Sequence, residues 1–279
     1  MNIKWYKIDI NTIKNYKPPF FCGSMLRGVF GVALKRVVCI NPTYKCDGCF
    51  TEQSCLYYSF FEQKNSFHQY RITSKLGMEH LKFSIYLFED STDELPYVLS
   101  AIKKALEEIG LGREKEHVKI TEISVNEKTI YNGNEFLPIS DIFPYEFELD
   151  EIYSDIKIDF KMPLRIKHNN QFAKNEISLS HLIINIHNRY RELKGLSLKK
   201  LGFKVEGKIA NSNLRYLDLY RYSNRQKSKM KLGGIIGDIT IKGVDEKSFY
   251  YLKLAEVIGV GKQTVFGLGD FEITPLGEE

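Results

Sequence analysis

Hydrophobic and polar positions follow two periods along this chain: one alternates every second residue, and the other repeats at helical spacing. In the first half, alternation predicts strands at residues 3–10, 81–88 and 118–125. Helical spacing predicts a helix over residues 25–37, with Ser24 as its N-cap, and a second helix over residues 95–109. The first half therefore predicts the order strand, helix, strand, helix, strand.

The second half of the chain repeats this order. The pattern predicts strands at residues 156–166, 203–209, 235–241 and 264–273, and helices at residues 179–193 and 246–258. The last helix of each half also ends alike, in ALEEIGLGR at residues 105–113 and in LAEVIGVGK at residues 254–262. Because both the endings and their positions match, the pattern indicates an internal duplication.

This element order predicts an α+β protein made of two tandem ferredoxin-like units, the split βαβ arrangement also found in RRM domains. The first unit is expected at residues 1–145, with a cysteine-bearing insertion at about 39–80. The second is expected at residues 146–279, after an acidic linker near residues 143–154. The sheet of such a unit is a common RNA platform, but the fold alone assigns no function.

Composition narrows the class of protein. The chain has 279 residues, of which 43% are hydrophobic, enough for a folded core. No run approaches the roughly 20 apolar residues of a membrane span, and the first ten residues lack the apolar core of a signal peptide. We therefore expect a cytoplasmic protein with reduced thiols that does not bind a membrane.

Basic and acidic residues are concentrated in different segments of the chain. The net charge of +5 does not by itself indicate nucleic-acid binding. However, residues 220–231 (YRYSNRQKSKMK) carry five basic residues and no acid, whereas residues 89–94 and 146–155 are acidic. A basic loop with tyrosines can contact phosphates and stack on bases, although an exposed charge run is more often only a solvated loop.

A glycine-rich segment, GVGKQTVFGLGDFEI at residues 259–273, resembles phosphate-binding loops. It matches neither of the two common nucleotide-binding motifs, the P-loop and the dinucleotide fingerprint. A P-loop requires Ser or Thr after the lysine and an earlier glycine, where this chain has Gln263 and Glu256. A dinucleotide fingerprint requires a third glycine where this chain has Thr264. Neither nucleotide ligand therefore fits the loop, and a nucleic-acid backbone stays open as its ligand.

Four cysteines lie within seventeen residues of one another, in the spacing Cys39-x6-Cys46-x2-Cys49-x5-Cys55. In a reducing compartment this spacing predicts a closed metal site with a structural role, most often zinc. Ligand type alone does not choose between zinc and an iron–sulfur cluster, and the alternative is a set of unrelated reduced thiols. Cys22 is expected to be a core thiol.

Taken in order, several of these motifs resemble the RAMP superfamily of CRISPR-associated proteins, in the branch of precursor-RNA-processing endoribonucleases. The motifs are FCGSMLRGVFG at residues 21–31, the cysteine segment at 39–61, RYSNRQ at 221–226 with LGGIIG at 232–237, and the glycine-rich segment. The resemblance implies two ferredoxin-like units that bind CRISPR repeat RNA. It also implies cleavage without a metal ion, in which the 2′-hydroxyl attacks the neighbouring phosphate and leaves a 2′,3′-cyclic phosphate.

The predicted RNA-binding residues are the bases and glycines of these motifs. They are Arg27, Arg36, Arg221, Arg225, Gln226, Lys229, Lys231, Gly259, Gly261, Lys262, Gly267 and Gly269. Arg27, Gly31 and Lys35 are four residues apart, so they share one face of the first helix. This face is either a basic surface with a glycine gap where RNA could approach or the solvated side of an amphipathic helix.

Catalytic residues are harder to assign. Relatives of this branch often carry a histidine on the first helix, where this chain has Val32. His68 is our substitute because its side chain titrates near neutral pH, and Tyr70 and Lys35 complete the predicted site. A site that works mainly through lysine and arginine with Tyr57 or Tyr70 stays open. Two other functions also stay open: a non-catalytic RAMP protein that binds crRNA in an effector complex, and a cysteine-cluster protein with a redox or scaffold role. The protein is expected to be a monomer or a homodimer.

Overall fold

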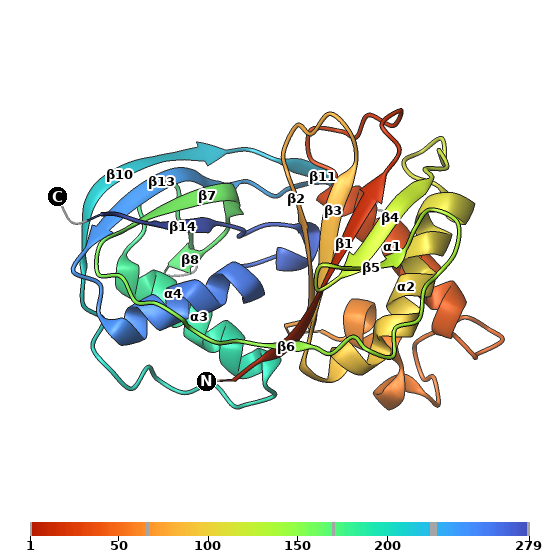
Figure 1. Cartoon of the computed structure of the whole chain (residues 1–279), viewed down its shortest axis with the longest axis horizontal. Coiled ribbons are helices and arrows are strands. Elements are labelled where there is room, and N and C mark those ends of the chain that lie inside the picture. The colour runs from red at the N-terminus through yellow and green to blue at the C-terminus, as the bar shows by residue number, and fades with distance from the viewer. Residues whose placement is uncertain (1, 65–66, 169–170, 224–227, 278–279) are drawn as a thin grey trace. The chain divides into compact units, whose positions relative to one another are not determined.

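The computed structural model describes residues 2–64, 67–168, 171–223 and 228–277 (Figure 1). The chain divides into two compact units, Met1–Glu146 and Phe147–Glu279; the sequence placed the division after residue 145. In the part of the chain described, no helix is long and apolar enough to cross a membrane.

Unit 1 contains an antiparallel sheet covered on one face by two helices (Figure 1). Its main elements are β1 (Lys4–Thr12), α1 (Gly23–Val38), β2 (Tyr70–Ser74), β3 (Lys82–Phe88), α2 (Leu95–Lys103), β4 (Ile120–Val125) and β5 (Lys128–Tyr131). The strand order is β2-β3-β1-β4-β5, and β6 (Tyr145–Glu146) pairs with the start of β1. The first four strands in this order and the two helices form the ferredoxin-like arrangement.

Unit 2 repeats the arrangement. Its main elements are β7 (Ile156–Leu164), α3 (Leu179–Leu193), β10 (Lys208–Leu217), β13 (Gly234–Lys242), α4 (Glu246–Ile258) and β14 (Glu272–Pro275). The strand order β10-β13-β7-β14 corresponds to β2-β3-β1-β4 of unit 1. Two small hairpins are added, β8 (Lys167–His168) with β9 (Gln171–Phe172), and β11 (Tyr220–Ser223) with β12 (Ser228–Lys231). The predicted α+β class with two ferredoxin-like units is confirmed.

Alternation explains the central strands. Along β1 every second side chain is buried, including Ile8 and Ile10, and the intervening residues face away from the core. Along β7, Ile156, Ile158 and Phe160 do the same. In each unit these strands lie in the interior of the sheet, so one face packs under the helices and the other carries polar side chains.

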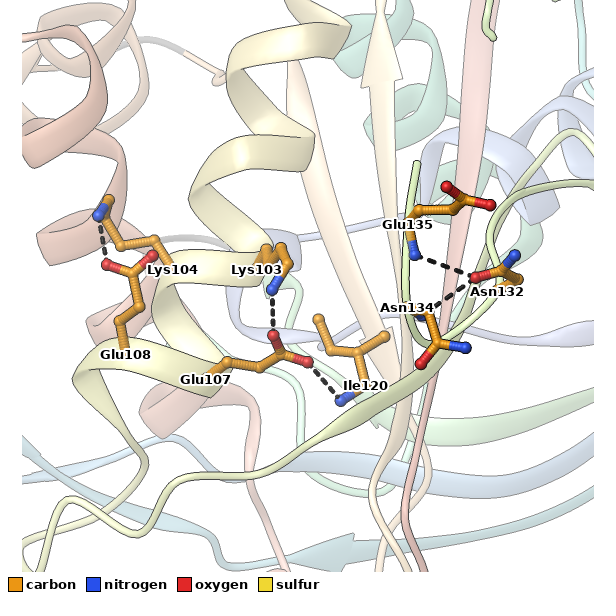
Figure 2. A network of polar contacts seen from close by, with 8 residues as sticks. All are labelled: Lys103, Lys104, Glu107, Glu108, Ile120, Asn132, Asn134 and Glu135. Atoms are coloured by element: carbon orange, nitrogen blue, oxygen red, sulfur yellow. Dashed lines mark hydrogen bonds and ion pairs between the residues drawn. The ribbon is translucent and has the colours of Figure 1, made fainter. Parts of the chain in front are cut away.

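A polar network joins the end of the second helix of unit 1 to its last ferredoxin strand (Figure 2). The turn η4 (Lys104–Ile109) continues α2, and Glu107 within it pairs with Lys103 on the preceding turn. The other oxygen of Glu107 accepts a hydrogen bond from the Ile120 amide at 3.0 Å. The carboxylate therefore fixes the start of β4 against the helix end.

Several predicted boundaries are wrong. The strand predicted at residues 203–209 lies at Lys208–Leu217, and the last strand begins at Glu272 rather than at residue 264. Strand β2 was missed because it is short and only Tyr70 and Ile72 in it are apolar, although four of its five residues are buried. Ser24 does not cap α1, which starts after Cys22 with no side-chain cap.

Candidate nucleic-acid interface

The glycine-rich segment follows α4 as a tightly folded loop. Gly259, Gly261, Gly267 and Gly269 all adopt positive φ angles, between 70° and 85°, which residues with a Cβ rarely adopt. The related ending in unit 1 begins the same way, because Gly110 and Gly112 have φ angles of 82° and 72°. There the chain closes on itself through a bridge between Leu111 and Glu116, whereas in unit 2 it packs against the end of β7.

The amides of this loop are used within unit 2. Those of Gly259, Gly267 and Gly269 donate to Ala255, Thr264 and Pro163, and that of Lys262 donates to the Arg165 carbonyl at 2.8 Å. All four glycines are buried, and the Lys262 side chain is exposed. The three glycines whose amides are engaged shape the loop, and the exposed Lys262 side chain is what the loop presents. RNA binding by these glycines stays a prediction.

The basic segment forms the β11–β12 hairpin, of which residues 224–227, including the predicted contacts Arg225 and Gln226, lie outside the described residues. The Arg221 guanidinium lies over the Phe266 ring of the glycine-rich loop, 4.7 Å from its centroid. The Lys229 ammonium lies 4.3 Å from the centroid of Tyr220, which is 44% exposed. Lys231 is exposed as well. Two segments about 40 residues apart in sequence thus form one basic and aromatic surface.

Sequence reasoning missed a third contributor to this surface. Arg165, directly after β7, donates through Nη1 to the Gly233 carbonyl at 2.8 Å and lies over the Phe172 ring at 3.7 Å. Its own carbonyl accepts from Lys262. The only sequence signal is the pair Arg165 and Lys167 after a buried strand, which no motif distinguishes from ordinary surface charge.

The solvent face of the unit 2 sheet has a different character. Lys157 pairs with Asp238 at 3.4 Å, and Lys161 pairs with Asp159 and with Glu272 at 2.5 and 3.6 Å. Because these lysines already have carboxylate partners, this face offers less positive potential to a polyanion than the loops do. We therefore place the candidate interface at the loops of unit 2 rather than on its sheet.

In unit 1, the predicted basic face of α1 is covered. Phe61, from the short helix η2 (Tyr58–Glu62), fills the gap at Gly31, where an added Cβ would lie 2.7 Å from its ring. Arg27 lies over Phe61 at 4.7 Å, and Lys35 lies over Tyr57 at 4.8 Å. The idea that RNA enters this glycine gap is wrong. Arg36, on another face of α1, is exposed.

The predicted catalytic residues His68 and Tyr70 differ in solvent exposure. His68 is half-buried, and its Nδ1 lies 2.9 Å from the Ser59 carbonyl, which can only accept, so Nδ1 donates in this contact. Tyr70 lies in β2, fully buried and stacked on Phe60 at 4.4 Å. Burial raises the pKa of Tyr70 to about 12. The catalytic role predicted for Tyr70 is not compatible with this position.

The four cysteines do not form a ligand set. Cys46 accepts from Lys35 at 3.3 Å, Cys49 contacts Thr51 and Asn41, and Cys39 donates to the Asn41 carbonyl. Hydrogen bonds from Thr51 lower the pKa of Cys49. Among the residues described, no group of three or more His, Cys, Asp or Glu side chains is placed to hold a metal ion. This geometry does not fit a closed four-thiolate site, and zinc on these cysteines stays a prediction.

The sequence matches two family models and one curated protein. A family model described as AF_1859_N, N-terminal domain, matches residues 1–141, and one described as CRISPR-associated endoribonuclease Cas6 matches residues 158–271. An uncharacterized protein of Archaeoglobus fulgidus is 25% identical, over 92% of this chain and 93% of its own length.

Solved structures share the fold over the whole chain. A Cas6 product complex is 13% identical, with a TM-score of 0.58 and coverage of 98% of this chain and 99% of its own. Thermus thermophilus Cas6 is 12% identical, with a TM-score of 0.52 and coverage of 98% of both chains. A RAMP protein that binds different RNA substrates is 11% identical, with a TM-score of 0.51 and coverage of 97% and 99%.

Unit 2 is similar to the family described as CRISPR-associated endoribonuclease Cas6, and the chain shares its two-unit ferredoxin-like fold with solved Cas6 and RAMP proteins, the superfamily that the sequence motifs resemble. The model that matches unit 1 covers half of the chain. The chain therefore belongs to the family described as AF_1859_N, N-terminal domain.

Proposed function

We propose that this protein binds CRISPR repeat RNA and cleaves the precursor transcript without a metal ion, by attack of the 2′-hydroxyl on the adjacent phosphate. The observation that carries the proposal is the Cas6 match to unit 2, where Arg221 lies over Phe266 of the glycine-rich loop and Lys229 lies beside the exposed Tyr220. Cations can hold phosphates and an exposed ring can stack on a base, which are the two contacts that single-stranded RNA needs.

For the chemistry we assign His68 as general base. Its Nε2 takes the proton of the 2′-hydroxyl, and the 2′-oxygen attacks phosphorus. The bond between phosphorus and the 5′-oxygen of the next nucleotide breaks, the departing oxygen takes a proton from water, and His68 returns its proton to the solvent. The products are a 2′,3′-cyclic phosphate and a 5′-hydroxyl. Lys35 is the cation proposed to stabilise the charge that develops on the phosphate, although it also contacts Cys46 and Tyr57.

The second candidate function is RNA binding without cleavage, as a subunit of a CRISPR effector complex. Two observations favour it. Val32, where relatives often have a histidine, is 48% exposed on α1 and can transfer no proton. Tyr70, the other proton donor we expected, is buried. Both observations leave His68 as the single acid–base candidate from the predicted set.

Incubation with repeat RNA in EDTA separates the two functions. Cleavage that leaves a cyclic phosphate, that a 2′-deoxy substitution at the cut site abolishes, and that His68→Ala reduces at least a hundredfold is the expected result. His80→Ala, in the same unit, is the matched control and should leave the rate unchanged. RNA that is bound but stays intact would assign the second function, and absence of binding at low salt would contradict both.

A further inference from the structure

Arg165 lies where three backbone segments of unit 2 meet. Its Nη1 donates to Gly233, which precedes β13, and its carbonyl accepts from Lys262 in the glycine-rich loop. Its guanidinium covers the ring of Phe172 in β9. At Gly261 an added Cβ would lie 2.7 Å from the Arg165 carbonyl, and at Gly234 one would lie 2.6 Å from the Leu164 carbonyl. Glycine at these positions thus lets the backbone come close to the end of β7.

The charge of Arg165 has no counterion among the residues of unit 2 that the structure describes. Among the described residues, the Gly233 carbonyl is the one hydrogen-bond acceptor of the guanidinium, and no carboxylate lies within 4.0 Å of Arg165 or Lys167. Nε of Arg165 is buried without an acceptor. Loss of hydration lowers the pKa of Arg165. A partly dehydrated cation without an anion is unfavourable, so the site gains from an anion that reaches it.

Lys167 lies two residues after Arg165, at the start of the β8–β9 hairpin. Its ammonium lies 5.3 Å from the centroid of the same Phe172 ring, and its side chain is exposed. Two cations therefore share one aromatic ring, which holds their stems in place without neutralising them. A planar guanidinium next to an ammonium suits an oxyanion with several acceptor oxygens.

We propose that Arg165 and Lys167 bind a phosphodiester of the RNA backbone and extend the RNA site of unit 2 from the β11–β12 hairpin to the β8–β9 hairpin. This inference rests on the proposed RNA-binding function and assigns two contacts that the predicted set lacks. The phosphate supplies the missing counterion, and its oxygens accept from the guanidinium. The Lys262 amide bonds to the Arg165 carbonyl, so the glycine-rich loop adjoins this site.

The test measures RNA affinity against salt concentration by fluorescence anisotropy. The probe is one fluorescein-labelled CRISPR repeat RNA from the genome that encodes this chain, with a 2′-deoxy nucleotide at the cut site. Arg165→Gln should lower affinity about tenfold or more at moderate salt. It should also reduce the slope of log affinity against log salt by about 0.7, the value for one phosphate contact to a single strand.

Three variants make the result specific. Arg165→Lys keeps the charge and should retain the slope. Lys167→Gln changes an exposed side chain, so it gives the same test of slope with the fold intact. Lys157→Gln removes a lysine of unit 2 that already pairs with Asp238, and it should change neither affinity nor slope.

The outcomes are separable. Unchanged slopes in both Arg165→Gln and Lys167→Gln would overturn this inference while the wild-type protein still binds RNA. Lower affinity of Arg165→Gln at an unchanged slope would also overturn it, because Arg165 would then only shape the loop. A wild-type protein that does not bind the repeat RNA at all would overturn the proposed function, and this inference with it.

Discussion

Tyr70 lies in a stack of side chains beneath α1, between the rings of Phe60 and Phe30 and near the guanidinium of Arg27. Its hydroxyl is shut off from water, so the deprotonated form is disfavoured in the folded protein. Arg27 opposes this effect but does not outweigh it, because the pKa is raised to about 12. Its buried environment therefore makes Tyr70 a core residue rather than a proton donor.

Tyr70→Phe should therefore change alkaline stability rather than activity. The pKa of Tyr70 is about 12 in the folded chain and about 10 in the unfolded chain. Above pH 10 the unfolded chain loses a proton that the folded chain keeps, so the wild-type free energy of unfolding falls as pH rises. The loss reaches roughly 2 kcal/mol at pH 12, and the variant should avoid it. Urea denaturation between pH 8 and pH 12 measures this; RNA cleavage that disappears at pH 7 would instead restore Tyr70 to the catalytic site.

Secondary-structure elements differ in how well their sequences predict them. Helices α3 and α4 have the predicted bounds, because each begins after a side-chain cap, Ser178 or Asp245, and carries a regular apolar stripe. Strand β10 was misplaced because most of its residues are exposed and polar, so little alternation marks it. The α1 face was misjudged because its cover, Phe61, comes from a short element about 30 residues further on.

Only part of the candidate interface could be predicted, because local sequence patterns mark some of its residues and not others. The β11–β12 hairpin and Lys262 stand out as local runs of charge or glycine. Arg165 does not, since its role depends on a contact with Gly233, 68 residues away along the chain. Local composition can indicate a basic loop, but it cannot indicate which distant backbone turn the fold brings beside an ordinary arginine.

The glycine-rich loop yields a prediction at this scale. Gly269 has a φ of 70°, and an added Cβ would lie 1.8 Å from the Val260 carbonyl. Gly269→Ala should therefore lower the free energy of unfolding by about 2 kcal/mol or more. Gly202→Ala, where no atom lies within 4 Å of the added Cβ, should stay within about 0.5 kcal/mol of wild type in the same thermal denaturation experiment. A Gly269→Ala protein of wild-type stability that no longer binds RNA would show that the loop backbone contacts RNA after all.

Across the whole molecule, net charge is a poor guide to where RNA binds. The chain carries +5, but its lysines fall into groups with different surroundings. Those on the unit 2 sheet face are matched by carboxylates, and those on the β11–β12 hairpin lie beside aromatic rings or in solvent. Counterion release depends on cations that can meet phosphates, so the two groups should contribute unequally to RNA binding.

Two double variants with the same net charge test this directly. Lys229→Ala with Lys231→Ala, and Lys157→Ala with Lys161→Ala, each reduce the charge from +5 to +3, since 5 − 2 = 3. The hairpin pair should weaken repeat-RNA binding and reduce the salt slope by about 1.4, or 0.7 for each lost phosphate contact. The sheet pair should leave the slope nearly unchanged, because Asp238, Asp159 and Glu272 already neutralise those lysines. Each exposed pair contributes less than about 1 kcal/mol to stability, so both variants should remain folded. Equal losses of affinity in the two would mean that overall charge, rather than the loops of unit 2, attracts the RNA.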